Sequence, residues 1–137
     1  CSERFQVIFP MHPRTKKNID NFNLIKDFEA VKGVVYTDPL DYFTFQKLIA
    51  CADGVITDSG GIQEETTFIG IPCVTLRENT ERPITIDIGT NELMDFDPPK
   101  ILNKLKELGS KPNQVPPLWD GNATQRIAEK LNEIYSV

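Results

Sequence analysis

Cysteine is scarce in this sequence: three residues stand far apart, at positions 1, 51 and 73, and no two form a CxxC pair. A disulfide framework or a zinc site organised by cysteine is therefore not expected, and we predict no metal site. Cys51 and Cys73 stand among apolar neighbours, which predicts that both are small, buried hydrophobic side chains. This cysteine usage favours a reduced, cytoplasmic setting.

Long apolar runs and an excess of basic residues are also missing. No apolar run approaches the roughly 20 residues that a helix needs to cross a bilayer, and no secretory signal is visible. Lys and Arg number 15 against 20 Asp and Glu, a formal net charge of -5. General nucleic-acid binding usually requires a basic balance, so we expect neither a nucleic-acid nor a membrane partner. A few local donors can still hold an anionic ligand.

An initiator methionine is absent too. The chain opens on Cys1, and a segment that resembles a buried strand follows almost at once, at residues 5–9. This abrupt opening suggests a segment of a longer protein. Its 137 residues suit one compact domain with its own core.

Short apolar segments predict strands at residues 5–9, 34–37, 54–57 and 73–76. Apolar residues at helical spacing predict helices between them, at residues 15–31, 41–52 and 61–69. Asp41 is expected to cap the second helix, and Gly70 to end the third. Strictly alternating strands and helices predict an α/β fold, a parallel sheet with helices on both faces.

Two more helices are expected after the sheet. Asp97, followed by two prolines, opens the first of them. Residues 109–118 are rich in Pro, Ser and Asn and predict a loop, after which Asp120 or Asn122 caps the last helix. The apolar stripes of the two helices are Ile101, Leu102, Leu105 and Leu108 in the first, and Ile127, Leu131 and Ile134 in the second.

The segment that points to chemistry is GVITDSGGIQEE, at residues 54–65. A strand ends, two glycines allow a tight turn, and a helix begins, where backbone N–H groups are unpaired and the local charge is partly positive. Gly60 and Gly61 would let a phosphate approach these donors, and Ser59 adds a hydroxyl. In a parallel sheet this turn lies at the carboxyl edge, where ligands bind. A capped βα turn without a ligand explains the same residues.

Acidic and basic side chains surround this turn in sequence. Glu65 comes four residues after Gly61, on the same helix face, where its carboxylate can accept hydrogen bonds from ribose hydroxyls. Gln63 and Glu64 are expected to point elsewhere, into solvent. The loop RENTERP at residues 77–83 follows a buried strand, and its Arg82 suits a diphosphate or a sugar hydroxyl. A solvated charged loop is the alternative.

Taken together, these motifs resemble those of the UDP-N-acetylglucosamine 2-epimerase family. The matching runs are DSGGIQEE (58–65), GIPCV (70–74), TERP (80–83) and GTN (89–91), flanked by PMHP (10–13) and DGNA (120–123). They cover essentially the whole chain. The resemblance implies that residues 1–137 are a single, truncated, UDP-binding carboxyl-terminal domain. It also implies a Rossmann-like sheet, one half of a glycosyltransferase-B arrangement.

The resemblance also assigns roles to residues. Ser59, Gly60 and Gly61 would bind the diphosphate, Glu65 the ribose hydroxyls, and backbone atoms of Phe45 the uracil edge. Arg82 would lie beside the sugar and phosphates, as the one catalytic candidate in this chain. His12 matches a histidine that binds a second UDP-N-acetylglucosamine as an activator, although the run after it, HPRT, departs from that of many members. A purely structural role for His12 is the alternative.

The reaction implied by the resemblance inverts C2 of UDP-N-acetylglucosamine and gives UDP-N-acetylmannosamine, through elimination and re-addition of UDP. No cofactor or metal is implied, and the full-length protein would be a homodimer. The carboxylates that act on C2 and a basic-loop histidine are expected upstream of Cys1, so the chain alone should bind UDP weakly and not epimerise. Alternatives are a hydrolysing epimerase, a nucleotide-sugar glycosyltransferase of the same architecture, and a non-catalytic flavodoxin-like module.

Overall fold

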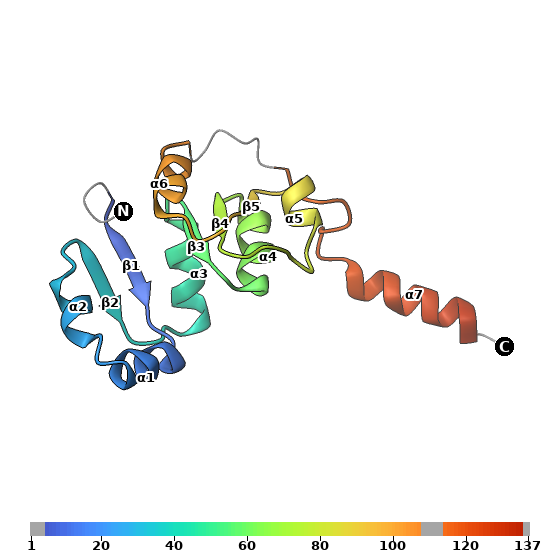
Figure 1. The fold of residues 1–137 in the computed structure, drawn as a ribbon. Coiled ribbons are helices and arrows are strands. Elements are labelled where there is room, and N and C mark those ends of the chain that lie inside the picture. The colour runs from blue at the N-terminus through green and yellow to red at the C-terminus, as the bar shows by residue number, and fades with distance from the viewer. Residues whose placement is uncertain (1–4, 108–113, 136–137) are drawn as a thin grey trace. The chain divides into compact units, whose positions relative to one another are not determined.

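The computed structural model describes residues 5–107 and 114–135, and it divides into two compact units, Cys1–Leu48 and Ile49–Val137 (Figure 1). Each unit has its own parallel ladder of strands and its own helices. The predicted α/β class with parallel strands is confirmed, although the strands form two hydrogen-bonded ladders. Three parts of the sequence-based expectations lie outside the described residues: Cys1, the Leu105 side chain and residues 108–113.

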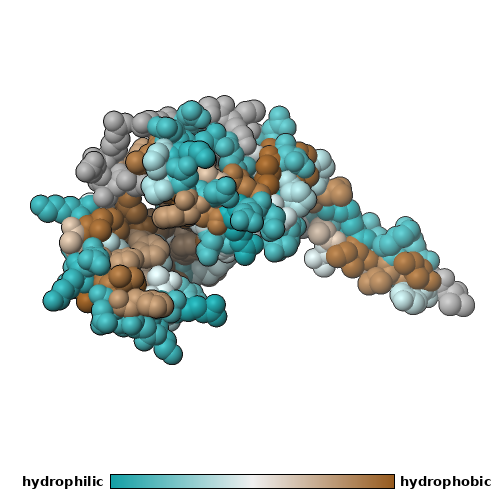
Figure 2. Space-filling view, in the orientation of Figure 1, coloured by the Kyte–Doolittle hydropathy of each residue, from teal (hydrophilic) through white to brown (hydrophobic). Residues whose placement is uncertain are grey.

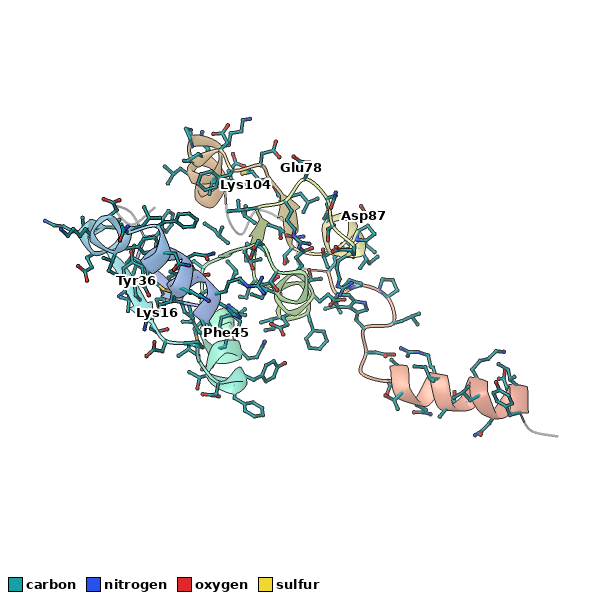
Figure 3. All side chains as sticks on the ribbon, turned by 60° about the horizontal axis from the view of Figure 1, so that its bottom comes forward. Lys16, Tyr36, Phe45, Glu78, Asp87 and Lys104 are labelled. Atoms are coloured by element: carbon teal, nitrogen blue, oxygen red, sulfur yellow. The ribbon has the colours of Figure 1, made fainter. Side chains whose placement is uncertain are left out.

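In the first unit, β1 (Val7–Pro10) pairs in parallel with β2 (Val34–Thr37). Tyr36 on β2 (Figure 3) joins the ladder to the helical connection, because its ring lies 6.2 Å from that of Phe9 and 5.6 Å from that of Phe28. Its hydroxyl also donates a hydrogen bond to the Phe28 carbonyl, at 3.2 Å. These aromatic contacts join β1, β2 and α2 within the unit.

The single helix predicted at residues 15–31 is wrong: the segment forms two helices, α1 (Pro13–Asn21) and α2 (Ile25–Ala30). Asn23 between them has a φ of 54°, a left-handed conformation that asparagine tolerates better than most residues and that interrupts a helix. The break between the two helices also interrupts the predicted apolar stripe. Ile19 is buried, whereas Phe22 at the break is 70% exposed.

The second unit contains β3 (Val55–Thr57), β4 (Cys73–Thr75) and β5 (Asn91–Leu93), parallel and in that order. Helix α4 (Gly60–Ile69) contacts all three strands, and the short helix α5 (Ile84–Asp87) contacts β5. Helix α3 (Tyr42–Ala50) precedes β3 and spans the boundary between the units. Neither α5 nor β5 was predicted, because the sequence of β5, Asn-Glu-Leu, lacks the apolar signal of a strand.

The residues predicted to begin or end helices do so in the structure. Asp41 accepts a hydrogen bond from the Thr44 backbone N–H at 3.1 Å, as an N-cap does. Gly70 ends α4 with a left-handed φ of 86°. Asp97 caps α6 (Pro98–Lys106), since its carboxylate accepts from the Lys100 N–H at 3.2 Å.

The two described cysteines differ in burial. Cys73 on β4 is 2% exposed, as predicted, and burial raises the pKa of its thiol. The expectation that Cys51 is buried is wrong, because Cys51 lies in the turn directly after α3 and is exposed. Its apolar neighbours in the sequence therefore did not indicate whether its own side chain is buried.

Helix α7 (Ala123–Tyr135) carries the predicted apolar stripe, but the described residues leave it uncovered. Ile127 and Ile134 are each 61% exposed and Leu131 is 48% exposed. Figure 2 shows apolar side chains gathered along this helix. The spacing is thus as predicted, whereas no residue of α7 is buried.

The start of α7 depends on one carboxylate. Asp120 accepts a hydrogen bond from the Asn122 N–H at 3.0 Å, and both of its oxygens lie 2.9 Å from Arg126 Nη1. Arg126 also donates through Nη2 to the carbonyl of Leu118, at 2.8 Å. Leu118 has a φ of 70°, so Arg126 supports a strained loop residue. Asn122, whose carbonyl accepts from the Arg126 N–H, lies directly before α7, and the Asp120 side chain holds the N–H of Asn122 rather than an N–H of the helix.

A pH dependence follows from this arrangement. The Asn122 N–H, followed by the Arg126 guanidinium, lowers the pKa of Asp120 to about 2, below the usual value of about 3.9. Because the pKa is lower in the folded chain, the carboxylate stabilises the fold above about pH 4, and this stabilisation is lost as the pH falls towards 2. Urea unfolding should therefore show that Asp120→Asn is less stable than wild type at neutral pH, with the difference shrinking between about pH 4 and pH 2. Asp20→Asn is the matched control, and a difference independent of pH would contradict the prediction.

Candidate functional site

The candidate site is built around the turn between β3 and α4. β3 ends at Thr57 and α4 begins at Gly60, with Ser59 in extended conformation as the N-cap. The Ser59 backbone N–H donates to Thr57 Oγ1 at 3.0 Å, which shapes the turn, but the Ser59 side chain forms no capping hydrogen bond. Within the described residues, the N–H groups of Gly60 and Gly61 have no backbone acceptor. A hydroxyl and two N–H groups are thus available to an anion at a helix N-terminus.

The two glycines of this turn are not required by the fold itself. Neither Gly60 nor Gly61 has a positive φ, so backbone conformation does not demand glycine. A Cβ at Gly60 would come no closer than 4.0 Å to another heavy atom, Glu81 Oε2. A Cβ at Gly61 would have Ser59 Oγ as its nearest neighbour, also at 4.0 Å. The space that the absent side chains leave is therefore open, which fits the close approach of a ligand.

Three consecutive side chains of α4 have different environments. Glu65 is half-buried, and its carboxylate forms no hydrogen bond or ion pair with residues 5–107 or 114–135. Glu64 was expected to be solvated, but its Oε2 lies 2.9 Å from Arg82 Nε, an ion pair without the alignment of a hydrogen bond. The Glu64 side chain is still 42% exposed, so that expectation is wrong only in leaving out the positive charge that the loop after β4 brings back to the helix.

Gln63 was also expected to point into solvent, and this expectation is wrong as well. Its side chain is fully buried, and its Oε1 accepts hydrogen bonds from Thr80 Oγ1 at 2.7 Å and from Asn91 Nδ2 at 3.1 Å. Gln63 precedes Thr66 by three residues, and Thr66 is buried on the same inner face of α4. The sequence signal that could have indicated this burial is the three-residue spacing, which places Gln63 on the same face of the helix as Thr66.

The loop at residues 77–83 begins at the same sheet edge as the glycine turn. Thr57 and Thr75, the last residues of β3 and β4, are paired in parallel register, so both connections leave the carboxyl edge together. Arg82 in this loop is held by Glu64, while its Nη groups have no hydrogen-bond partner among the described residues. Glu78 in the same loop is exposed (Figure 3). The loop is therefore solvated in part and anchored to α4 at Arg82.

Phe45 and His12 belong to the first unit. Phe45 is a half-buried residue of α3 (Figure 3), and its N–H donates to the carbonyl of Asp41 at 2.9 Å within the first turn of that helix. His12 is exposed and caps α1, because its Nδ1 accepts from the Arg14 N–H at 3.2 Å. His12 thus has a structural function, and the ligand-binding roles of both residues stay predictions.

Residues 5–107 and 114–135 contain no group of three or more His, Cys, Asp or Glu side chains placed to hold a metal ion. Over the same residues, no helix combines the length and the apolar character that crossing a membrane requires.

Comparison with curated proteins finds relatives along almost the whole chain. A relative from Methanococcus maripaludis, named UDP-N-acetylglucosamine 2-epimerase, is 46% identical over 122 residues, which are 88% of this chain and 33% of the relative. A protein of the same name from Methanocaldococcus jannaschii is 38% identical over 126 residues, 91% of this chain and 34% of the relative. The chain therefore spans about a third of the length of these relatives.

Solved structures and a family model agree with these relatives. The Methanocaldococcus jannaschii UDP-GlcNAc 2-epimerase in complex with UDP-GlcNAc and UDP superposes with a TM-score of 0.84 at 35% identity, over 96% of this chain and 36% of that one. Another structure of the enzyme from that organism gives a TM-score of 0.80 at 35% identity, over 95% and 36% of the two chains. The family model described as UDP-N-acetylglucosamine 2-epimerase matches residues 1–132, nearly the full length. This chain belongs to the UDP-N-acetylglucosamine 2-epimerase family.

Proposed function

We propose that this chain is the UDP-binding part of a protein that interconverts UDP-N-acetylglucosamine and UDP-N-acetylmannosamine. The observation that carries the proposal is the glycine turn at the start of α4, where two backbone N–H groups have no backbone acceptor among the described residues, the Ser59 hydroxyl forms no capping hydrogen bond, and a Cβ on either glycine would have room. A related structure, that of the Methanocaldococcus jannaschii epimerase, contains UDP-GlcNAc and UDP, which supports a nucleotide sugar as the ligand. In this proposal residues 1–137 form a single UDP-binding domain, one half of a glycosyltransferase-B arrangement.

The proposed contacts divide the nucleotide between two parts of α4. Ser59, Gly60 and Gly61 bind the diphosphate, because unpaired N–H groups at a helix N-terminus favour an anion. Glu65, one turn further along, accepts hydrogen bonds from the two ribose hydroxyls, since its carboxylate has no partner among the described residues. In the first unit, backbone atoms of Phe45 read the uracil edge.

Arg82 contributes to the chemical step in this proposal. Elimination of UDP breaks the bond between C1 and the phosphate oxygen, so negative charge grows on the leaving diphosphate. The Nη groups of Arg82, without a partner among the described residues, can donate charge-assisted hydrogen bonds to it while Nε stays beside Glu64. The groups that remove and return the C2 proton lie outside this chain, so the chain alone binds UDP and does not epimerise.

Further parts of the proposal concern the whole protein. We propose a homodimer in the cytoplasm, without a cofactor, and with His12 contacting a second UDP-N-acetylglucosamine that acts as an activator. The exposed imidazole of His12 supports the last point, because Nδ1 faces the Arg14 N–H and Nε2 has no partner within the described residues.

The test is a product analysis. The complete protein that contains this chain is incubated with UDP-N-acetylglucosamine and no acceptor, and the products are followed by proton NMR. We expect UDP-N-acetylmannosamine to appear, with no turnover by the 137-residue chain alone. Free N-acetylmannosamine and UDP would indicate the hydrolysing reaction instead. Formation of neither manno sugar would contradict the proposal and favour a glycosyltransferase or a non-catalytic module.

A further inference from the structure

A closed ring of hydrogen bonds surrounds the backbone of Arg82. The Arg82 N–H donates to Thr80 Oγ1 at 3.0 Å, and the Thr80 hydroxyl donates to Gln63 Oε1 at 2.7 Å. On the other side, the Arg82 carbonyl accepts from Thr85 Oγ1 at 2.8 Å. Asn91 closes the ring, since its Nδ2 lies 3.2 Å from Thr85 Oγ1 and 3.1 Å from Gln63 Oε1. Both polar groups of the Arg82 backbone are thus fixed by side chains.

The side chains of this ring are largely removed from solvent. Gln63, Thr85 and Asn91 are fully buried, and Thr80 is half-buried. Asn91 is fixed further, because its Oδ1 accepts from Thr75 Oγ1 at 2.6 Å. A buried polar group is costly when it loses its partner, which disfavours the opening of these hydrogen bonds, although Gln63 Nε2 itself has no partner among the described residues.

The ring links the two elements of the candidate site, α4 and the loop at residues 77–83, to β5 and α5. Gln63 belongs to α4, which begins at the glycine turn, Asn91 to β5, and Thr80 to the loop that carries Arg82. The guanidinium of Arg82 is held separately, by Glu64 on the same helix. Gln63 therefore reaches the Arg82 backbone through Thr80, and its neighbour Glu64 pairs with the Arg82 side chain.

We propose that Gln63, Thr80, Thr85 and Asn91 are positioning residues, which hold Arg82 ready beside the phosphate-binding turn. This inference rests on the proposed function, because it needs Arg82 to contact UDP. A fixed backbone reduces the conformational freedom that the arginine would otherwise lose on binding, and affinity is gained without a further contact. Loosening the ring therefore weakens UDP binding only through Arg82.

The experiment compares two changes at Thr80 with one outside the ring. Thr80→Val keeps the shape but removes the hydroxyl, whereas Thr80→Ser keeps the hydroxyl. Thr90→Val is the matched control: Thr90 is 6% exposed, and its hydroxyl donates to the Ile71 carbonyl at 2.7 Å, outside the ring. Each variant of the 137-residue chain is titrated with UDP by calorimetry, and amide hydrogen exchange of Arg82 is measured by NMR without ligand.

We expect Thr80→Val to bind UDP about three- to tenfold more weakly and to exchange the Arg82 amide faster by a similar factor, as for the loss of one hydrogen bond. Thr80→Ser and Thr90→Val should stay within about twofold of wild type in both measurements. In an Arg82→Gln background, Thr80→Val should cause no further loss of affinity, which a general loss of stability would not reproduce.

Two outcomes overturn different parts of the argument. A wild-type chain that does not bind UDP overturns the proposed function, and the positioning role with it. A wild-type chain that binds UDP, together with unchanged affinity in Thr80→Val or an equal loss in the Arg82→Gln background, overturns the positioning role alone.

Discussion

Glu65→Ala is expected to weaken UDP binding by about 10- to 100-fold, with the fold of the chain unchanged. The carboxylate is half-buried on the second turn of α4 and has no partner among the described residues, so its removal leaves no internal group unpaired. The proposed hydrogen bonds to the ribose involve a charged acceptor, and each such bond contributes about 1.5–3 kcal/mol. Since about 1.4 kcal/mol corresponds to a factor of ten in affinity, the loss should be readily measured by calorimetry.

Ser59→Ala should produce a loss of similar size, because its hydroxyl would donate to a charged phosphate oxygen. Its side chain does not cap α4, so the helix itself should not be destabilised. Glu78→Ala is the control, as it removes an exposed carboxylate from the nearby loop (Figure 3). UDP affinities of Ser59→Ala and Glu65→Ala equal to that of wild type would show that the site is assigned wrongly.

Gly89→Ala is expected to have the largest effect on stability, a loss of about 3 kcal/mol. Gly89 is buried between α5 and β5, and a Cβ there would lie 2.5 Å from Thr67 Oγ1 and Cγ2 and 2.6 Å from the backbone carbonyl oxygen of Thr85. Thr67 is fully buried and both of its γ atoms meet the new Cβ, and the carbonyl is fixed in α5, so neither contact is easily relieved. Overpacking of this kind typically costs about 1–3 kcal/mol, and the backbone contact places this site at the upper end.

Gly61→Ala is the matched control for Gly89→Ala and should behave in the opposite way. Its Cβ would meet nothing within 4.0 Å except Ser59 Oγ at that distance, and alanine favours a helix over glycine by up to about 1 kcal/mol. Urea unfolding followed by circular dichroism should therefore show unchanged or slightly raised stability, while UDP binding weakens because the methyl group occupies the phosphate space. Equal stability losses in the two variants would contradict this account.

Local sequence signals determined much of the fold. The strands at residues 34–37 and 73–76 were placed to within a residue, because each is a short apolar run. Asp41, Gly70 and Asp97 act at helix ends as predicted, since a cap depends on backbone groups within a few residues of it. A signal of this range can be read without knowledge of the tertiary structure.

The break at Asn23 and the strand β5 show where such signals fail. Residues 15–31 have helical spacing throughout, and one left-handed asparagine divides them. β5 carries two polar residues, and it becomes a strand through its parallel pairing with β4. Pairing between distant segments decided both the existence of β5 and the burial of Asn91.

The candidate site likewise contains residues that the sequence located and residues that only the tertiary structure revealed. The turn with Ser59, Gly60 and Gly61 could be located from sequence alone, because a strand, two glycines and a helix follow one another directly. That Gln63 is buried depended on the tertiary structure, since its partners Thr80 and Asn91 lie 17 and 28 residues away. A hydrogen bond between residues so far apart leaves no local pattern, because only the folded chain brings donor and acceptor together.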